Sequence, residues 1–344
     1  MNRLPLPYPA VLYLLWLPLL CGCIHSYPTL TENGEEGVDP TRVGVQWCAS
    51  LPLEWEMLKP PAENAAGYRC RFVTEVRREG KTIARQTDFL KAESLEEEIV
   101  ILPLKQKLHA VEYTLLVWVD YVEQGTETSL FYCVDDTEKI TCLEPYIGGT
   151  PLRACLCGSV ALDLRRYRDN WHAEIETGIE WECPQAAYRL VATDVQEFLQ
   201  EIGNRREPQE KFFVTFSYDS FFPTVFNGYE RTPCDSWLGV SFTVPLLLED
   251  RNIKEIVIGG DYLFAGAEKS TLWLTLSVTD SQGNEISRYE RIAITCQQGQ
   301  VTELHRNFLT GKPESVKIDQ EYDGEDTIID LDKLIKQNPL NSQR

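Results

Sequence analysis

The chain has 344 residues and a formal net charge of −20, with 33 lysine and arginine residues against 53 aspartate and glutamate residues. Nucleic acid binding requires clustered lysine and arginine side chains, so an acidic sequence in which no block of basic residues is recognised disfavours it. Peripheral binding to anionic lipid is disfavoured for the same reason. The hydrophobic content of 43% and the charged content of 25% are those of a folded globular protein.

The N-terminal stretch has the pattern of a bacterial lipoprotein signal. Arg3 precedes an apolar run from Ala10 to Leu20, which is too short for a transmembrane helix but right for the core of a signal peptide. Gly22 stands just before Cys23, as in a lipobox, in which a lipid is attached to the cysteine on cleavage. The alternative is an ordinary signal peptide cleaved nearby, with Cys23 incidental. We therefore expect a body held to a membrane surface by a lipid on Cys23.

Strand-like patterns dominate the chain after the signal region. Apolar and polar residues alternate from Tyr68 to Val76, and the run from Tyr113 to Val122 is apolar enough for a central strand. Short strands recur in both halves, and glycine and proline at 147–151 mark a boundary between them. The sequence thus predicts an all-β fold of two tandem immunoglobulin-like β-sandwiches. The expected parts are a signal peptide at 1–22, a flexible tether at 23–41, an N-terminal β-sandwich at 42–147, a C-terminal β-sandwich at 151–311 and an acidic tail at 312–344.

One helix is expected in the second half of the chain. Apolar side chains from Val195 to Ile202 fall on a single face, and Gly203 can end the helix. Thr193 or Asp194 can cap its N-terminus. Such a helix would pack on a sheet face or close one open end of the C-terminal sandwich.

The cysteines predict buried thiols rather than a disulfide framework. Of the eleven, Cys21 is removed with the signal peptide and Cys23 carries the lipid in this interpretation. The remaining nine are an odd number, and their spacing is not that of a small disulfide-stapled scaffold. Several lie inside apolar strand patterns, where cysteine acts as a small hydrophobic residue. Cys155 and Cys157 lack the two-residue gap of a zinc knuckle, so no metal site is expected.

The sequence shows no recognisable catalytic motif. Neither a nucleophile elbow nor a Ser-x-x-Lys motif with its partners occurs, and the four histidines are widely scattered. Asp120 ends a very apolar strand, but an aspartate that caps the turn near Gly125 explains it better than a ligand or a catalytic acid. Gly259 and Gly260 precede Asp261 without the glycine spacing of a phosphate loop, which indicates a bulge in a strand. We expect no enzyme, no catalytic residue and no cofactor.

Six stretches, spread in order over both halves of the body, carry a family resemblance. They are Tyr113 to Tyr121, Arg189 to Phe198, Val214 to Asn227 with Phe221-Phe222-Pro223 at its centre, Gly260 to Phe264, Val278 to Ser287 and Asn307 to Thr310. In this order they resemble the fimbrillin-like surface lipoproteins of gut and oral Bacteroidales, especially those related to the fimbrial anchor subunits.

The resemblance implies two transthyretin-like β-sandwiches and a lipid-held, non-enzymatic role in pilus anchoring or assembly. The implied partners are other fimbrial subunits, and the implied place is the outer membrane, with the body exposed at the cell surface. Ile24 to Tyr27 follow Cys23 where surface-exported members often carry an acidic cluster. This difference leaves a periplasmic face as an open alternative.

The C-terminal segment is a candidate for binding a partner. In strand-exchange assembly a subunit both accepts a strand and donates one. The acidic tail contains short alternating patches that could form such a strand, with Val316, Ile318, Ile328 and Leu331 as candidate residues. The alternative, which the sequence favours, is a tail that completes its own sheet or stays disordered.

A glycan-binding lipoprotein is the alternative from another functional class. Trp171, Trp181 and Trp237, together with Tyr229, are the candidates for stacking on sugar rings, although aromatic side chains in a β-sandwich more often belong to the core. Rings gathered on one exposed face would favour glycan binding. A free sheet edge or groove would favour the assembly of subunits.

Overall fold

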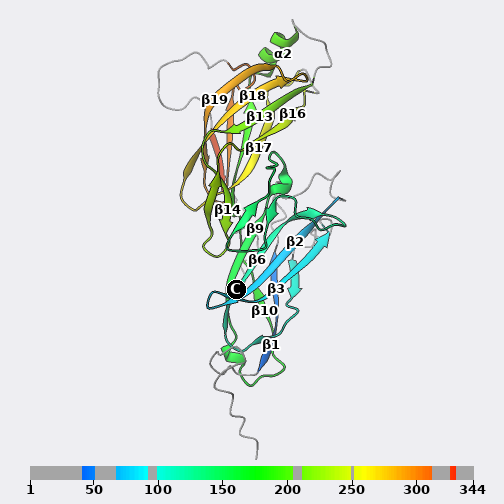
Figure 1. Cartoon of the computed structure of the whole chain (residues 1–344), viewed down its shortest axis with the longest axis vertical. Helices are drawn as coiled ribbons and strands as arrows, with labels where there is room; N and C mark the ends of the chain where they lie inside the picture. Colours follow the sequence, from blue (N-terminus) through cyan, green and yellow to red (C-terminus); the bar gives the residue numbers. More distant parts are fainter. Residues whose placement is uncertain are drawn as a thin grey trace, which may run out of the picture.

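A computed structural model describes residues 41–50, 67–91, 99–203, 211–248, 252–311 and 326–330. These residues form two β-sandwiches stacked end to end, and the α-helix among them belongs to the second sandwich (Figure 1). The predicted all-β class, the two sandwiches and the helix in the second are confirmed. The expected signal peptide and nearly all of the expected tether lie outside the described residues, as do Cys23, Val316, Ile318 and Leu331.

Two sheets face each other in the N-terminal sandwich. In one sheet β1 is central and pairs in parallel with β10 and antiparallel with β4 and β5. Its strands are β10 (Glu174–Gly178), β1 (Arg42–Ser50), β4 (Ile99–Pro103) and β5 (Leu108–His109). The other sheet runs in the order β11 (Trp181–Glu182), β9 (Leu156–Asp163), β6 (Glu112–Glu123), β2 (Tyr68–Arg78) and β3 (Lys81–Lys91).

The C-terminal sandwich has two sheets as well, and each of them has four strands. The first runs in the order β17 (Ile256–Phe264), β12 (Gln185–Ala192), β20 (Gln300–Arg306) and β21 (Asp326–Asp330). The second runs in the order β16 (Ser241–Leu246), β13 (Phe212–Tyr218), β18 (Ser270–Asp280) and β19 (Glu285–Cys296). Phe212 to Tyr218 alternate strictly between buried and half-buried, as expected of a strand with one face in a core.

A small fifth sheet combines strands from both halves of the chain. Its order is β15 (Thr232–Trp237), β14 (Phe222–Asn227), β8 (Ile140–Cys142) and β7 (Tyr132–Cys133). Tyr132 of this sheet lies 5.7 Å, ring to ring, from Trp118 of β6, and a Cβ on Gly228 would lie 3.1 Å from Leu116. The fifth sheet therefore covers the outer face of β6. This explains why β6 is a continuous apolar run rather than an alternating one.

Strand pairing places the end of the N-terminal sandwich later than the sequence indicates. Strands β9 and β10 follow the predicted boundary at 147–151, yet β9 pairs with β6 and β10 pairs with β1. The second sandwich begins with β12, so the chain passes from one sandwich to the other at Cys183 and Pro184. Residues 147–151 instead touch the second sandwich before the chain returns, since a Cβ on Gly148 would lie 2.4 Å from the ring of Phe242. The short 3-10 helix η4 (Pro151–Arg153) follows this contact.

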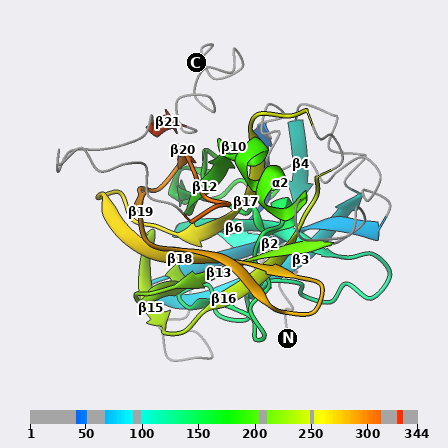
Figure 2. The ribbon, with the colours of Figure 1, turned by 90° about the horizontal axis from the view of Figure 1, so that it is seen from above.

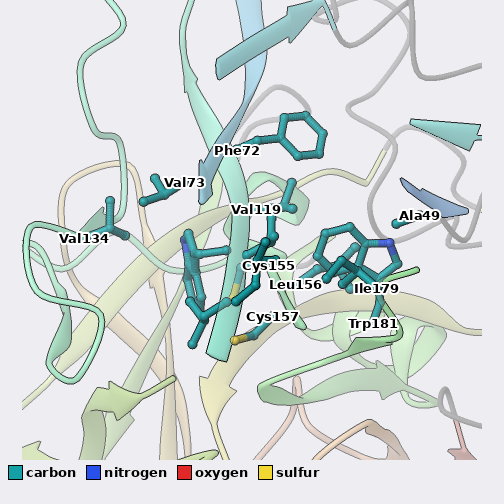
Figure 3. Packing of buried hydrophobic residues seen from close by; sticks show 14 of the residues in the cluster. Ala49, Phe72, Val73, Val119, Val134, Cys155, Leu156, Cys157, Ile179 and Trp181 are labelled. Atoms are coloured by element: carbon teal, nitrogen blue, oxygen red, sulfur yellow. The ribbon is translucent and has the colours of Figure 1, made fainter. Parts of the chain in front are cut away.

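Each sandwich encloses its own apolar core. In the first, the ring of Trp47 lies 6.1 Å from that of Trp181 and perpendicular to it. Figure 3 shows part of this core, where Cys155 and Cys157 pack as small apolar residues beside Leu156. In the second core the rings of Phe216 and Phe242 are stacked 4.6 Å apart.

Helix α2 (Val195–Gly203) lies at the end of the second sandwich that is remote from the first (Figure 1). Its buried face packs on a sheet through Phe198, whose ring lies 5.5 Å from that of Phe212. The buried Asp194 side chain binds the end of the sandwich, where its Oδ2 accepts hydrogen bonds from the backbone N–H and the hydroxyl of Thr310, both at 2.8 Å. Asp194 thus ties the start of the helix to the segment after β20.

The nine cysteines of the described ranges form no disulfide, in agreement with the prediction from the sequence. Most are buried, and burial raises the pKa of Cys70, Cys157 and Cys296 to about 12. At neutral pH these three side chains therefore carry almost no thiolate, which is the reactive form. Cys234, on the outer strand β15, is exposed.

Alkylation of the folded protein at neutral pH should therefore modify Cys234 first. Cys70, Cys157 and Cys296 should stay unmodified until denaturant is added, because burial both suppresses the thiolate and excludes the reagent. Mass spectrometry of peptides from the unreduced protein measures both effects. Fast labelling of Cys157 in the folded protein, or a pair of disulfide-linked peptides, would contradict this packing.

Candidate functional site

A buried acidic residue joins the two sandwiches. The Oδ2 atom of Asp261, on β17, accepts hydrogen bonds from the hydroxyls of Tyr146 at 2.6 Å and Tyr218 at 2.8 Å. Its Oδ1 atom accepts one from the backbone N–H of Gly149 at 3.3 Å and lies 3.7 Å from Nε of Arg153. Tyr146, Gly149 and Arg153 belong to the connection before β9, whereas Asp261 and Tyr218 belong to the second sandwich. One carboxylate therefore binds both bodies.

The two glycines before Asp261 have a local structural reason. The pairing of β12 with β17 shifts register beside Gly259, which confirms the bulge that the sequence predicts here. Gly259 has φ 148°, which L side chains rarely adopt, and a Cβ on Gly260 would lie 2.1 Å from the carbonyl oxygen of Tyr188. Larger residues at either position would disturb the strand that carries Asp261.

Aromatic rings surround the Arg153 guanidinium beside the same carboxylate. Its guanidinium lies 4.3 Å from the ring centre of Tyr146 and 5.4 Å from that of Tyr132, and it donates a hydrogen bond to the carbonyl oxygen of Ile147 at 3.0 Å. Burial raises the pKa of the Asp261 carboxyl, and the Arg153 charge and the tyrosine hydroxyls oppose that rise. Because the carboxylate has its partners inside the protein, the cluster suits a structural joint better than a reaction centre.

The hairpin of β14 and β15 makes a second tie between the sandwiches. The backbone N–H of Gly228, at its tip, donates to the carbonyl oxygen of Thr137 at 2.9 Å. The hydroxyl of Tyr229 donates to Oε1 of the buried Glu75 at 3.1 Å, and the guanidinium of Arg77 lies 4.5 Å from the ring centre of Tyr229. Tyr229, a candidate for sugar stacking from the sequence, thus has a structural contact with the first sandwich.

The three candidate tryptophans do not form one exposed stacking face. Trp181 is only 5% exposed and packs against Trp47 in the core, so its ring cannot stack on a sugar. Trp237 is half-buried and contacts the cores of both sandwiches. Trp171 is 55% exposed and follows the short 3-10 helix η5 (Arg165–Tyr167). Strand patterns could not predict that Trp181 is buried, since it lies in a two-residue strand that is too short to show alternation.

Asp120 forms a buried ion pair rather than the expected turn cap. Its carboxylate receives two hydrogen bonds from Arg71, from Nε at 2.8 Å and from Nη2 at 2.6 Å. The two residues are directly opposite each other on β6 and β2. The sequence shows both charges, but only the strand register shows that they meet.

The C-terminal strand β21 occupies the edge of a sheet. It pairs antiparallel with β20, and Ile328, one of the candidate donor residues, is opposite Thr302 (Figure 2). The C-terminal segment therefore extends a sheet of its own chain, which is the arrangement that the sequence favours over donation to a partner.

Three large apolar side chains are exposed on segments of the second half of the chain whose backbones are neighbours. Phe221 is 64% exposed, Leu238 is 65% exposed and Trp273 is 39% exposed. Phe221 precedes Phe222 and Leu238 follows Trp237, and Phe222 and Trp237 are opposite each other on β14 and β15. The backbone N–H of Trp273 donates to Oγ of Ser220 at 3.3 Å. We call Phe221, Leu238 and Trp273 the apolar patch. Exposed apolar groups gathered in one place are typical of an interaction site.

Neither a metal centre nor a membrane-spanning helix is found in the part of the chain that the structure describes. No group of three or more histidine, cysteine, aspartate or glutamate side chains in these ranges is placed to hold a metal ion. Within the same ranges, every helix is too short or too polar to cross a membrane.

The fold and its joint define an all-β protein of two rigidly connected sandwiches, with a sheet edge and apolar side chains at the surface. The chain belongs to a protein family of unknown function, DUF6562, whose family model matches residues 34–339. No curated protein matches the chain.

Several solved structures are similar over most of their length, at low identity. A candidate cell adhesion protein from Bacteroides eggerthii is 10% identical with a TM-score of 0.44, and the match covers 84% of this chain and 96% of that one. A candidate polysaccharide-binding protein from Bacteroides thetaiotaomicron is 9% identical with a TM-score of 0.40, with 77% and 90% covered. The fimbrial anchor protein Mfa2 from Porphyromonas gingivalis is 13% identical with a TM-score of 0.37, with 77% and 90% covered.

Replacing Arg153 with alanine should lower the free energy of unfolding by about 3–5 kcal/mol, because it leaves the Asp261 carboxylate buried without its cation. Unfolding in urea, followed by tryptophan fluorescence, measures the change. Arg165→Ala is the matched control, since it removes an arginine whose pair with Asp163 is exposed, and it should leave stability almost unchanged. Similar small losses for both variants would show that the joint does not depend on a buried charge.

Proposed function

We propose that this protein is a lipid-anchored component of the cell envelope that acts in the anchoring or assembly of a fimbria, and in adhesion. It works through protein–protein contact without catalysis, and its partners are other fimbrial subunits. It is attached at the outer membrane through a lipid on Cys23. The sequence resemblance to fimbrillin-like lipoproteins supports this role. The structural observation that carries it is the position of β21 at the edge of β20.

A strand at the edge of a sheet presents backbone N–H and C=O groups that any extended segment can pair with. β20 is bound on one side by β12 and on the other by β21, which is the last of the described strands in this sheet. β21 contributes five residue pairs, and each backbone hydrogen bond adds only about 0.5–1.5 kcal/mol of net stability. A longer strand from another subunit can therefore take its place, and β21 can in turn add to a partner's sheet.

The arrangement of the two sandwiches separates this edge from the expected anchor. The hydroxyl of Thr41, at the start of the described chain, accepts a hydrogen bond from the backbone N–H of Asp169, just after η5. This place is at the free end of the first sandwich, whereas β21 belongs to the second (Figure 1). The joint at Asp261 fixes the two bodies to each other, so a partner held at one end is connected firmly to the anchor at the other.

The apolar patch offers a second contact for a subunit on the same sandwich as β21. Its three side chains come from separate segments held in place by strand pairing. An apolar patch contributes buried surface to an association but does little to align the two proteins. An exchanged strand aligns them, because its backbone hydrogen bonds fix the register. The two features complement each other in a subunit that must bind a partner in one orientation.

Replacing Cys23 with alanine should abolish acyl labelling of the protein in cells fed a labelled fatty acid, because the thiol is the predicted lipid acceptor. Cys21→Ala is the matched control and should keep the label, since Leu20 rather than a small residue precedes Cys21. Labelling that persists in the Cys23 variant would show that Cys23 is not the lipid acceptor, and the proposed attachment through Cys23 would be wrong.

A reversible disulfide between β20 and β21 tests the strand position. Gln300 and Asp330 are directly opposite each other, and such antiparallel pairs have Cα atoms about 4.5–5.5 Å apart, within the reach of a disulfide. The oxidised variant Gln300→Cys with Asp330→Cys should lose capture of fimbrial subunits, because β21 can no longer leave. Reduction should restore the capture. Affinity purification from envelope extracts, with the captured subunits identified by mass spectrometry, measures both states.

The control locks a strand pair of the other sheet in the same sandwich. Ser277 and Arg288 are opposite each other on β18 and β19, so Ser277→Cys with Arg288→Cys leaves β21 able to move. This variant should capture subunits equally well when oxidised and when reduced. If the β20–β21 variant behaves in the same way, β21 is not exchanged and the observation on which the proposal rests has no role in assembly.

A further inference from the structure

An open hollow at the free end of the N-terminal sandwich is lined by four arginines. Arg77 and Arg78 come from the end of β2, whereas Arg165 and Arg168 come from η5 and the turn after it. The hollow has a volume of about 420 Å³, and Glu79 and residues 111–114 complete its lining. The two arginine pairs lie far apart in the sequence, so only the fold brings them together.

Acidic neighbours neutralise part of this charge. Nη2 of Arg165 lies 2.5 Å from Oε1 of Glu112 and 2.8 Å from Oδ2 of Asp163. Nη1 of Arg77 lies 2.5 Å from Oε1 of Glu138. Arg77 and Arg165 are therefore held in place, and they contribute little net charge to the hollow.

Two exposed arginines at this end keep their charge. Arg168, in the hollow, and Arg166, beside it, have no ion-pair partner among the described residues. Arg166 lies over the ring of Tyr167, with 4.8 Å between the guanidinium carbon and the ring centre. Arg78 has only a looser contact of 3.3 Å with its neighbour Glu79. Arg166 and Arg168 therefore present guanidinium groups without an ion pair at this surface, next to the exposed Asp169, in a protein whose net charge is −20.

An exposed tryptophan stands beside these arginines. Trp171 follows Arg168 by three residues, and 55% of its surface is exposed, an uncommon state for the largest apolar side chain. Tryptophan and tyrosine favour the level of lipid headgroups, where the ring is partly apolar and its polar atom stays wet. Guanidinium groups bind phosphate oxygens through two parallel hydrogen bonds. Together these side chains suit a surface of lipid phosphates.

The N-terminal segment enters the fold at the same place. The Thr41 hydroxyl accepts a hydrogen bond at 3.1 Å from the backbone N–H of Asp169, the residue after Arg168. Cys23 precedes Thr41 by eighteen residues, a length that reaches at most about 65 Å when fully extended. A lipid at Cys23 would keep this end of the molecule close to the membrane, although the charge pattern at this end does not depend on that lipid.

We propose that Arg166, Arg168 and Trp171 dock on the phosphate groups of an anionic membrane surface. The arginines bind the phosphate oxygens, and the indole of Trp171 lies among the headgroups. The same surface repels the acidic remainder of the protein, so the molecule stands with this end towards the membrane and the second sandwich away from it. The inference goes beyond the proposed fimbrial role, because it concerns the free end of the first sandwich, whereas β21 belongs to the second.

The test measures sedimentation of the full chain with vesicles of phosphatidylcholine alone, or of phosphatidylcholine mixed with phosphatidylglycerol. More protein should sediment with the mixed vesicles, and the excess should fall as salt is added. Arg166→Glu with Arg168→Glu should weaken the phosphatidylglycerol-dependent affinity by about tenfold or more, since each basic side chain near such a surface contributes roughly fivefold. Trp171→Ser should weaken binding to the mixed vesicles with no change in net charge.

Lys254→Glu with Lys269→Glu is the matched control, because it makes the same change in net charge at exposed positions of the second sandwich. This variant should keep most of the difference between the two vesicle types. Equal losses in the two double variants, or no preference for phosphatidylglycerol in the unaltered chain, would overturn the proposal. A lipid or an apolar signal segment acts alike on both vesicle types, so failure here leaves the fimbrial proposal untouched.

Inorganic phosphate distinguishes a membrane surface from a free phosphate ion as the ligand. At equal ionic strength, phosphate should release no more protein from the mixed vesicles than chloride does, because both salts act only by screening the surface charge. If calorimetry instead shows that the hollow binds inorganic phosphate while the mixed vesicles leave the protein in solution, the ligand is the free ion and the membrane proposal is wrong.

Discussion

The carboxylate of Asp261 is the interaction on which the placement of the two sandwiches depends. A buried carboxylate is costly unless donors surround it, and the donors here come from both bodies. The sandwiches cannot separate without leaving this charge and the Arg153 guanidinium without their partners. The fifth sheet adds a second tie, because β8 of the first half and β14 of the second share one ladder. Two tandem domains are thus fixed at two places rather than joined by a flexible linker.

This rigidity gives meaning to the different chemistry of the two ends. The chain enters beside an arginine-rich end with an exposed tryptophan, whereas the second sandwich carries a sheet edge occupied by β21 and the apolar patch. If the sandwiches moved freely, contacts at one end would not orient the other. If the basic end attaches to a membrane as proposed, the buried joint directs the second sandwich away from that membrane.

The sequence predicts the local features of this fold and misses the long-range ones. The alternating residue types of β2 and the apolar face of α2 arise from neighbours in the chain, so both elements could be recognised. Burial along β2 is nevertheless continuous, because its polar residues Arg71 and Glu75 have partners inside the protein. The return of β9 and β10 to the first sandwich depends on pairing with distant strands, which local composition does not reveal. The same holds for Arg71 with Asp120 and for the Arg153–Asp261 joint, where register decides which charges meet. The arginines of η5 form a short basic run in the sequence, but their companions come from β2.

The position of β1 inside its sheet has a mechanical consequence. β1 is the first described strand after the expected anchor, and it is bound on both sides, by β10 from Gly44 to Cys48 and by β4 from Gln46 to Ser50. In the proposed arrangement, tension between a lipid on Cys23 and a partner on the second sandwich would run along the length of β1. Its hydrogen bonds are then loaded in shear and must fail together, whereas a strand pulled sideways peels away one bond at a time. Rupture under force is governed by the rate of unfolding, so this geometry favours a long lifetime under tension.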